Sequence, residues 1–386
     1  MINITNPQQC CGCTACASVC TKNAITMEPD ALGFLYPKVN TDLCIDCGAC
    51  EKVCAFNENY DKSLLFDQPL AFGARHIDNR EVETSRSGAA FIALSDYILN
   101  QGGVVYGAGY TDHFRVVHKR AETKEQRDEF KGSKYVQSDL TGIFRQVKLD
   151  LKSGLFVLFS GTPCQCAGLT SYIGKRLRDK LYLVDIVCHG VPSPYIWRDY
   201  LDYQEKKNGI EFTEVNFRDK SKIGWVAHKE SFRGDNFYKL TSHYTFLFYK
   251  HIMFRHSCEV CPYTNLKRTG DVTIADFWGY QKTNPEVNID NKGYSLVFCN
   301  TSKGKDWLDK VRSDLNVIPA DLENCMQPNL KGPSSISEHR FSFEKDYAKK
   351  GFLYVGQKYG DLGWKYSLIY MAQNIKNIIK FLLLKK

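Results

Sequence analysis

Several patterns that define other protein classes are absent from this 386-residue sequence. Gly107 and Gly109 follow a strand-like segment, but no third glycine completes G-x-G-x-x-G, so a nicotinamide-binding Rossmann site is not expected. No basic run alternates with aromatic residues, which argues against nucleic-acid binding. No signal-peptide pattern opens the chain, and we therefore expect a reducing cytoplasm in which the sixteen cysteines are not paired as disulfides.

Cysteine is abundant near the N-terminus. The spacing C-x2-C-x2-C-x3-C occurs twice, at Cys10, Cys13, Cys16 and Cys20 and again at Cys44, Cys47, Cys50 and Cys54. This is the spacing of ferredoxins with two [4Fe-4S] clusters, in which the fourth cysteine of each run binds the other cluster. We predict one cluster on Cys10, Cys13, Cys16 and Cys54, and the other on Cys44, Cys47, Cys50 and Cys20. A zinc site, which needs four ligands in two pairs, does not account for eight cysteines in two identical runs.

The pattern of the chain divides it into three parts. Residues 1–58 form the predicted ferredoxin module, and the polar residues 57–63 are predicted to form a linker. Residues 70–330 alternate strand-like and helical segments, which is typical of an α/β domain. Residues 331–386 are predicted to form a helical tail. The expected fold class is therefore an α+β ferredoxin module followed by an α/β domain, and we expect that domain to bind a flavin and a further iron–sulfur cluster.

Continuous apolar segments identify the centre of the α/β domain. Residues 155–159 and 181–187 are predicted to form strands buried on both faces, connected by a crossover helix over 165–176. Further helices are expected over 89–100 and 140–151, and further strands over 104–106 and 295–299.

Two cysteines follow these predicted buried strands. Cys164 comes after the first strand and Cys188 after the second, so both are expected at the carboxyl edge of the sheet. Cys258 and Cys261, in a C-x2-C pair, could complete the ligands of a third [4Fe-4S] cluster. The alternative is that Cys164 and Cys188 are small core residues and the C-x2-C pair belongs to a zinc site or a redox pair. Cys166 is the main rival to Cys164 as a ligand.

Clusters transfer one electron at a time, whereas reduction of an organic carbon centre usually needs two. A flavin converts between these regimes, so a flavin is expected beside the third cluster. Two loops are candidates for its phosphates: residues 85–89, which open a predicted helix, and residues 131–135. Each could equally be an ordinary helix cap or turn.

Together these segments resemble the coenzyme F420 hydrogenase/dehydrogenase beta-subunit family in the form that carries an N-terminal two-cluster ferredoxin. The matching residues lie at 132–138, 161–165, 188–194, 217–220, 258–262 and 270–279. The resemblance implies an FAD in contact with Ser87, Gly88, Lys134, Tyr135 and Ser138, to which we add Thr162, and a third cluster on Cys164, Cys188, Cys258 and Cys261. It departs from the family at Ala89 and Ala275, where glycine is usual.

The family resemblance leaves the physiological role open. We expect an oxidoreductase that passes electrons from a low-potential carrier through the clusters and FAD to an organic acceptor, and bacterial relatives are associated with surface-polysaccharide synthesis. The alternative is an electron-transfer subunit that relays between a soluble carrier, such as ferredoxin or the deazaflavin coenzyme, and a separate catalytic partner. The modest net charge of +8 would suit an acidic redox partner or an anionic substrate. Cysteine-bound clusters of this kind suggest an anaerobic host.

Two residues are predicted to serve as acid or base. His189 and Asp276 adjoin the expected cofactor elements, and protonation of a reduced carbon needs a positioned donor. Either could instead be a residue satisfied by the backbone at the end of a strand or turn. Arg218 and Lys220 could bind a phosphate or carboxylate of the substrate, or lie in a solvated loop.

The last segment has apolar residues at helical spacing from Leu368 to Leu382, with lysines interspersed. It is too polar for a membrane span. We expect this helix to dock on the protein or on a partner, or to associate peripherally with a membrane surface.

Overall fold

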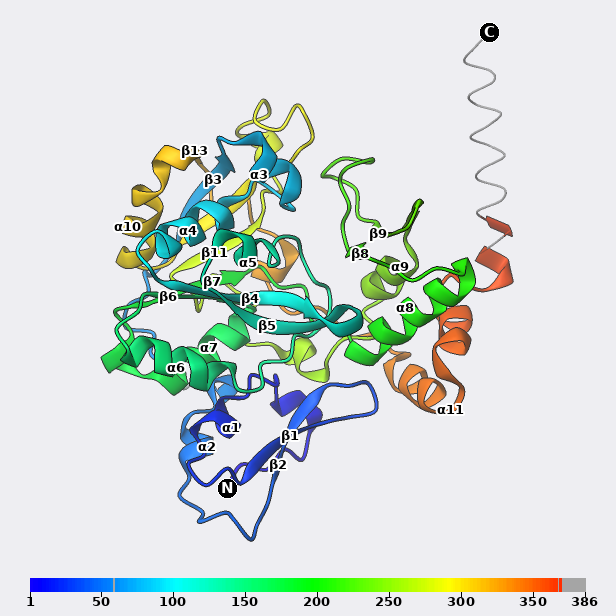
Figure 1. Cartoon of the computed structure of the whole chain (residues 1–386), viewed down its shortest axis with the longest axis horizontal. Coiled ribbons are helices and arrows are strands. Elements are labelled where there is room, and N and C mark those ends of the chain that lie inside the picture. Colours follow the sequence, from blue (N-terminus) through cyan, green and yellow to red (C-terminus); the bar gives the residue numbers. More distant parts are fainter. Residues whose placement is uncertain (58–59, 367, 370–386) are drawn as a thin grey trace.

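The computed structural model describes residues 1–57, 60–366 and 368–369. The N-terminal module contains a two-stranded antiparallel sheet, β1 (Ile25–Pro29) and β2 (Leu35–Val39). Two short helices, α1 (Ala15–Val19) and α2 (Ala49–Lys52), follow the two cysteine loops, and the single turns η1 (Pro7–Gln9) and η2 (Ala55–Asn57) stand near its two ends. The module lies below the rest of the molecule in Figure 1.

An eight-stranded sheet forms the centre of the molecule. Its strands lie in the order β13 (Leu315–Pro319), β3 (Leu70–His76), β12 (Ser295–Cys299), β11 (Val272–Asp276), β7 (Leu181–Ile186), β6 (Val157–Gly161), β4 (Val104–Thr111) and β5 (Arg115–Ala121). The four strands β11, β7, β6 and β4 are parallel, whereas the outer strands on both sides pair antiparallel. This mixed sheet behind a ferredoxin module confirms the α/β class predicted from the sequence.

Alternating side chains of the central strands pack on opposite faces of the sheet. On β6, Val157 and Phe159 pack with α6 (Ile143–Lys152) and α7 (Pro163–Ile173), whereas Leu158 packs with α4 (Ala90–Leu99) and α10 (Ser302–Lys310). Each face therefore has its own apolar core, as the continuous apolar sequence of β6 and β7 requires. Two short helices, α3 (Asn79–Thr84) and α5 (Lys124–Asp128), complete this part.

The predicted helices and strands of this domain are confirmed, with shifted ends. The helix expected from residue 140 begins at Ile143, because Gly142 adopts a left-handed backbone (φ 81°) just before it. The crossover helix begins at Pro163, where Thr162 and Gln165 form a reciprocal capping box, and ends at Gly174.

A third part was not predicted from the sequence. It contains a small antiparallel sheet of β8 (Glu214–Asn216), β9 (Glu230–Gly234) and β10 (Phe237–Thr241), with α8 (Pro194–Asn208), α9 (His243–Tyr249) and α11 (Arg340–Lys358). The buried Glu230 carboxylate accepts hydrogen bonds from the Tyr200 and Thr241 hydroxyls and from the Tyr244 N–H at the start of α9. Glu230 therefore fixes this helix to the sheet.

The module is attached to the α/β domain by polar contacts to its backbone. Arg145 on α6 donates hydrogen bonds to the carbonyls of Ala17 (2.8 Å), Ser18 (3.1 Å) and Cys20 (3.0 Å) at the end of α1. The Tyr263 hydroxyl donates to the Ala55 carbonyl. Apolar residues of the module also enter the core between α6, α7 and the sheet.

Part of the predicted tail is described. Helix α11 lies within residues 331–386, and its backbone is interrupted at Gly351 (φ 74°). The apolar stripe predicted from Leu368 to Leu382 lies outside the described residues, except for positions 368 and 369. No helix in the described part of the chain has the length and apolarity needed to cross a membrane.

Candidate metal and cofactor sites

The two N-terminal cysteine loops share an unusual backbone. Each contains two residues in the left-handed region: Gly12 (φ 70°) and Thr14 (φ 66°) in the first loop, Asp46 (φ 47°) and Gly48 (φ 70°) in the second. Such turns point successive N–H groups into the loop, which favours bound anions and the sulfides of iron–sulfur clusters. The repeated backbone therefore fits the repeated cysteine spacing.

The cysteines of the module gather in crossed sets. Cys20 lines one small cavity together with Cys44, Cys47 and Cys50, although it belongs to the other loop. In the second set, burial raises the pKa of Cys16, and the neighbouring Cys13, Cys10 and Cys54 raise it further. The two groups of neighbouring cysteines have the same members as the two ligand sets predicted from the sequence.

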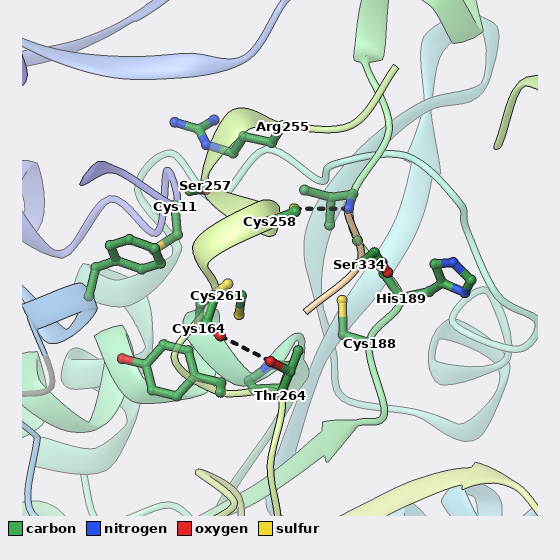
Figure 2. Close-up of a pocket in the computed structure, with 15 residues that line it drawn as sticks. Cys11, Cys164, Cys188, His189, Arg255, Ser257, Cys258, Cys261, Thr264 and Ser334 are labelled. Carbon is green, nitrogen blue, oxygen red and sulfur yellow. Dashed lines mark hydrogen bonds between the residues drawn. The ribbon is translucent and has the colours of Figure 1, made fainter. Parts of the chain in front are cut away.

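Four cysteines of the main domain converge at the edge of the sheet that faces the module. Figure 2 shows the side chains of Cys164, Cys188, Cys258 and Cys261 directed toward a common centre. They come from the start of α7, the segment just after β7 and the turn η5 (His256–Val260) with the residue after it. A set of four sulfur donors suits an iron–sulfur cluster or zinc, and neutral thiols have little reason to gather there without a metal.

Burial raises the pKa of three of these thiols. It raises that of Cys258 to about 12 and shifts Cys188 and Cys261 in the same direction. Cys164 differs: a hydrogen bond from Cys11 and one from Thr162 lower its pKa despite burial. The Thr162 hydroxyl lies 3.2 Å from the Cys164 sulfur. Metal binding would be required to keep all four as thiolates.

The other cysteines of this region have different surroundings. Cys166 is fully buried, and its thiol lies 3.6 Å from the Val184 carbonyl, away from the cavity of the four cysteines. Cys11, which the sequence analysis assigned no role, lines that cavity between the module and Cys164. All sixteen cysteines lie in the described part of the chain, and each is a free thiol.

A larger cavity of about 380 Å³ adjoins the four cysteines. It is within the usual range for small-molecule sites. The predicted cofactor residues Ser87, Lys134, Tyr135, Ser138 and Thr162 line it, as do both predicted acid–base residues, His189 and Asp276. Gly88 does not, because it lies against the sheet, where a Cβ would meet the Ala74 carbonyl at 2.2 Å and the Ser295 nitrogen at 2.6 Å.

Buried donors without partners line the same cavity. Among the described residues, the Nε atoms of Arg86 and Arg218 and the hydroxyl of Ser85 are buried with no hydrogen-bond partner. Buried polar groups are nearly always satisfied, so such atoms indicate a ligand with acceptor oxygens. The cavity and its donors therefore fit a flavin nucleotide, whose phosphates and ring carbonyls are acceptors.

Several predicted polar residues are already engaged in protein contacts. Asp276 accepts from the Arg218 guanidinium (2.5 Å) and from the Trp225 indole (3.1 Å), so both of its carboxylate oxygens have protein partners. Lys134 donates to three backbone carbonyls, and burial lowers its pKa to about 7. Lys220 likewise donates to the carbonyls of Val82, Ser87 and Lys292. Lys134 lines the larger cavity, whereas Lys220 is not among its lining residues.

His189 lies on the segment that separates the two cavities. Its Nε2 is 2.7 Å from Nε2 of His251, and Nδ1 of His251 lies 2.8 Å from the Ser335 carbonyl. Burial lowers the pKa of His189 to about 4. Because a carbonyl can only accept, Nδ1 of His251 donates to Ser335. Nε2 of His189 can then donate to Nε2 of His251, which leaves Nδ1 of His189 as an acceptor.

Sequence reasoning missed several residues of the larger cavity. Nε2 of His118 donates to the Ser160 carbonyl (2.9 Å), and Nδ1 of the neutral ring accepts from the Ser138 hydroxyl (2.8 Å). The Gln165 amide donates to the same hydroxyl (3.2 Å). No spacing in the sequence connects His118 to this site, because β5 meets the loop after α5 only in the folded chain.

The structure and two family matches agree on the class of protein. The chain is an iron–sulfur protein of the electron-transfer type: residues 9–57 match the 4Fe-4S dicluster domain. Residues 156–323 match the family described as the C terminus of the coenzyme F420 hydrogenase/dehydrogenase beta subunit. No curated protein matches the chain.

Among the solved structures that match the chain, one illustrates the extent of the similarity. A chain of the F420-reducing [NiFe] hydrogenase complex from Methanosarcina barkeri is 18% identical, with a TM-score of 0.47. The match covers 77% of this chain and 92% of the hydrogenase chain.

Proposed function

We propose that the chain is the iron–sulfur and flavin-binding electron-transfer subunit of a larger oxidoreductase. One observation supports this most: the cavity of the four cysteines and the 380 Å³ cavity share Cys188, His189, Gly190 and Val191. A cluster on the cysteines and a flavin in the larger cavity would therefore be separated by one short segment. The family description as a beta subunit supports a role beside partner chains.

In this proposal the residues around the larger cavity hold FAD. Arg86, Arg218 and Ser85 supply the unpaired donors, and Tyr135, Phe248 and Tyr249 supply aromatic surface. A flavin would exchange single electrons with clusters and two electrons with an organic or deazaflavin carrier. His189 positions the segment between the cavities, and Asp276 orients Arg218.

A second candidate is that the chain itself reduces an organic acceptor. The volume and the cationic wall of the larger cavity favour this, because an anionic substrate could share the cavity with the cofactor. A deazaflavin coenzyme is one such carrier in the family. No described feature bears on surface-polysaccharide synthesis.

The experiment compares FAD affinity with and without the unpaired Arg218 donor. Arg218→Lys keeps a cation beside Asp276 but removes Nε, so we expect FAD to bind about tenfold more weakly in fluorescence titrations, which is about 1.4 kcal/mol. Arg198→Lys, on the exposed side of α8, is the matched control and should bind as the parent does. Equal affinity of all three proteins would contradict the proposed flavin site.

Carrier exchange separates the two candidates. Protein reduced anaerobically and then mixed with oxidised ferredoxin or deazaflavin coenzyme should be reoxidised rapidly if the chain is a relay. Failure to exchange electrons with either carrier, with reoxidation by a small organic acceptor, would favour the second candidate.

A further inference from the structure

Arg255 joins the module to the segment that carries the third set of cysteines. Its side chain is fully buried (0% exposed), and it stands directly before η5, whose Cys258 N–H donates to the Arg255 carbonyl at 3.0 Å. In Figure 2 its guanidinium extends away from the four cysteines toward the module. Arg255 is therefore close in sequence to Cys258 and Cys261 of the main domain, while its side chain reaches Cys10 of the module.

The guanidinium contacts neutral groups and one sulfur. It donates to the carbonyls of Cys10 (2.7 Å) and Leu35 (2.9 Å) and to the Gln137 side chain (2.8 Å), and Nη2 lies 3.6 Å from the Cys10 sulfur. Its positive charge also lies 4.1 Å from the centre of the Tyr36 ring. The planar group is thus held on several sides, in contact with a predicted cluster ligand.

This buried charge has no carboxylate partner. No described aspartate or glutamate forms an ion pair with Arg255, although the buried arginines at positions 127 and 268 each have one. An uncompensated buried charge costs several kcal/mol, so a compensating negative charge is expected nearby. A cubane held by four thiolates is a net anion and becomes more negative on reduction, and Cys10 is one of its predicted ligands.

We infer that Arg255 is a positioning residue that raises the reduction potential of the cluster predicted on Cys10, Cys13, Cys16 and Cys54. With both clusters bound, the step would be a single-electron transfer, in which the cluster held by Cys20, Cys44, Cys47 and Cys50 would lose one electron and the cluster beside Arg255 would gain it. The fixed positive charge stabilises the added electron and changes no covalent bond. Arg255 would thereby favour electron transfer from the cluster lined by the exposed Cys47 toward the cluster next to the main domain.

The test measures the midpoint potential of each cluster in the full-length, anaerobically reconstituted protein by potentiometric titration with EPR detection. In Arg255→Met, the equilibrium for reducing the cluster beside position 255 should fall at least tenfold, which is about 59 mV for one electron. The cluster on the other set of the module should keep its potential and serves as the internal reference. Arg255→Lys retains the charge and should restore most of the shift.

A second variant keeps the test decisive if Arg255→Met does not assemble. Gln137→Glu places a carboxylate at the group that accepts from Nη1, so it neutralises Arg255 without removing it, and it should lower the same potential. Arg145→Gln is the matched control, because this exposed arginine also binds the module backbone but touches no sulfur. It should shift neither potential, since water screens its charge.

The outcomes separate an electrostatic role from a structural one. Unchanged potentials in Gln137→Glu or in an assembled Arg255→Met, or equal shifts of both module clusters, would overturn the inference. The measurement uses only the clusters of the dicluster domain. Absence of FAD would therefore contradict the proposed function and leave this inference standing.

Discussion

At the scale of single residues, position in the fold separates cysteines that look alike in the sequence. Cys164 and Cys166 are two residues apart on α7, yet only Cys164 lines the cavity with Cys188, Cys258 and Cys261. Cys166 contacts the Val184 carbonyl inside the core. The helix turns these side chains in different directions, so only Cys164 lies beside the other three cysteines of the proposed metal site.

This difference predicts the result of two matched substitutions. Cys164→Ala should lower the iron content of reconstituted protein from about twelve to about eight atoms per chain, because the third cubane loses a ligand. Cys166→Ala should retain about twelve. The reverse pattern in iron and acid-labile sulfide assays would show that Cys166 is the ligand.

A second residue-scale prediction concerns the buried His118. Burial lowers its pKa to about 4, while the unfolded state keeps the usual value of about 6.5. Between pH 4 and 6.5 the unfolded state binds more protons than the folded state. The stability that the neutral, buried His118 contributes is therefore complete above pH 6.5, and it falls by about 1.4 kcal/mol per pH unit as the pH drops toward 4.

The control is His118→Gln, whose amide can bond to both Ser138 and Ser160 but does not titrate. Urea unfolding of both proteins at pH 7 and pH 5 should show an extra loss of about 2 kcal/mol in the parent. Parallel losses in the two proteins would exclude His118 as the cause.

Partners distant in sequence explain what residue-level reasoning could not predict. Cysteine spacing predicted the ferredoxin module because ligands on one loop must be a fixed number of residues apart. By contrast, Asp276 was predicted as an acid or base from its place beside expected cofactor elements, and nothing in the sequence reveals its ion pair with Arg218, 58 residues earlier. The position of Cys11 beside Cys164 depends equally on how the module docks.

At the scale of elements, the turn before α4 shows how backbone geometry limits substitution. Gly88 lies so close to the sheet that a Cβ would meet backbone atoms at 2.2 and 2.6 Å. The next residue, Ala89, holds a left-handed backbone (φ 61°) at the start of the helix, where the resembling family usually has glycine. The sequence therefore has glycine where space requires it and alanine where only the backbone is strained.

Two substitutions in this turn should affect the free energy of unfolding differently. Gly88→Ala should lower the free energy of unfolding by about 1–3 kcal/mol, because the backbone must move to admit a methyl group. Ala89→Gly should be neutral or raise it by up to about 1 kcal/mol, since relief of the left-handed strain exceeds the added freedom of the unfolded chain. Chemical denaturation measures the free energy of unfolding of both variants and of the parent. A Gly88→Ala variant with the same free energy of unfolding as the parent would contradict the close packing of Gly88.

Element prediction succeeded where the local pattern and the burial agree. The apolar runs of β6 and β7 are buried on both faces, and their crossover helix was expected for the same reason. The small sheet of β8, β9 and β10 was missed because its strands are three to five residues long, and because its middle strand begins with the charged Glu230. A buried carboxylate satisfied by distant hydroxyls has no signature in the local sequence.

At the scale of the whole molecule, the cysteine sets and the larger cavity follow one another. One set lies at the outer cavity of the module, the next adjoins Arg255, the third lies at the edge of the sheet, and the larger cavity begins at Cys188 and His189. Arg255 contacts Cys10 and also lines the cavity of the third set, and Cys188 and His189 line both that cavity and the larger one. This order is what a relay of single electrons to a flavin requires.

The most direct measurement is the iron, acid-labile sulfide and flavin content of the full-length protein after anaerobic purification and reconstitution. Three cubanes and a flavin correspond to about twelve irons and one FAD per chain, which is the expected result. About eight irons with no flavin would contradict the third cluster and the flavin cavity, leaving only the ferredoxin module as a redox centre.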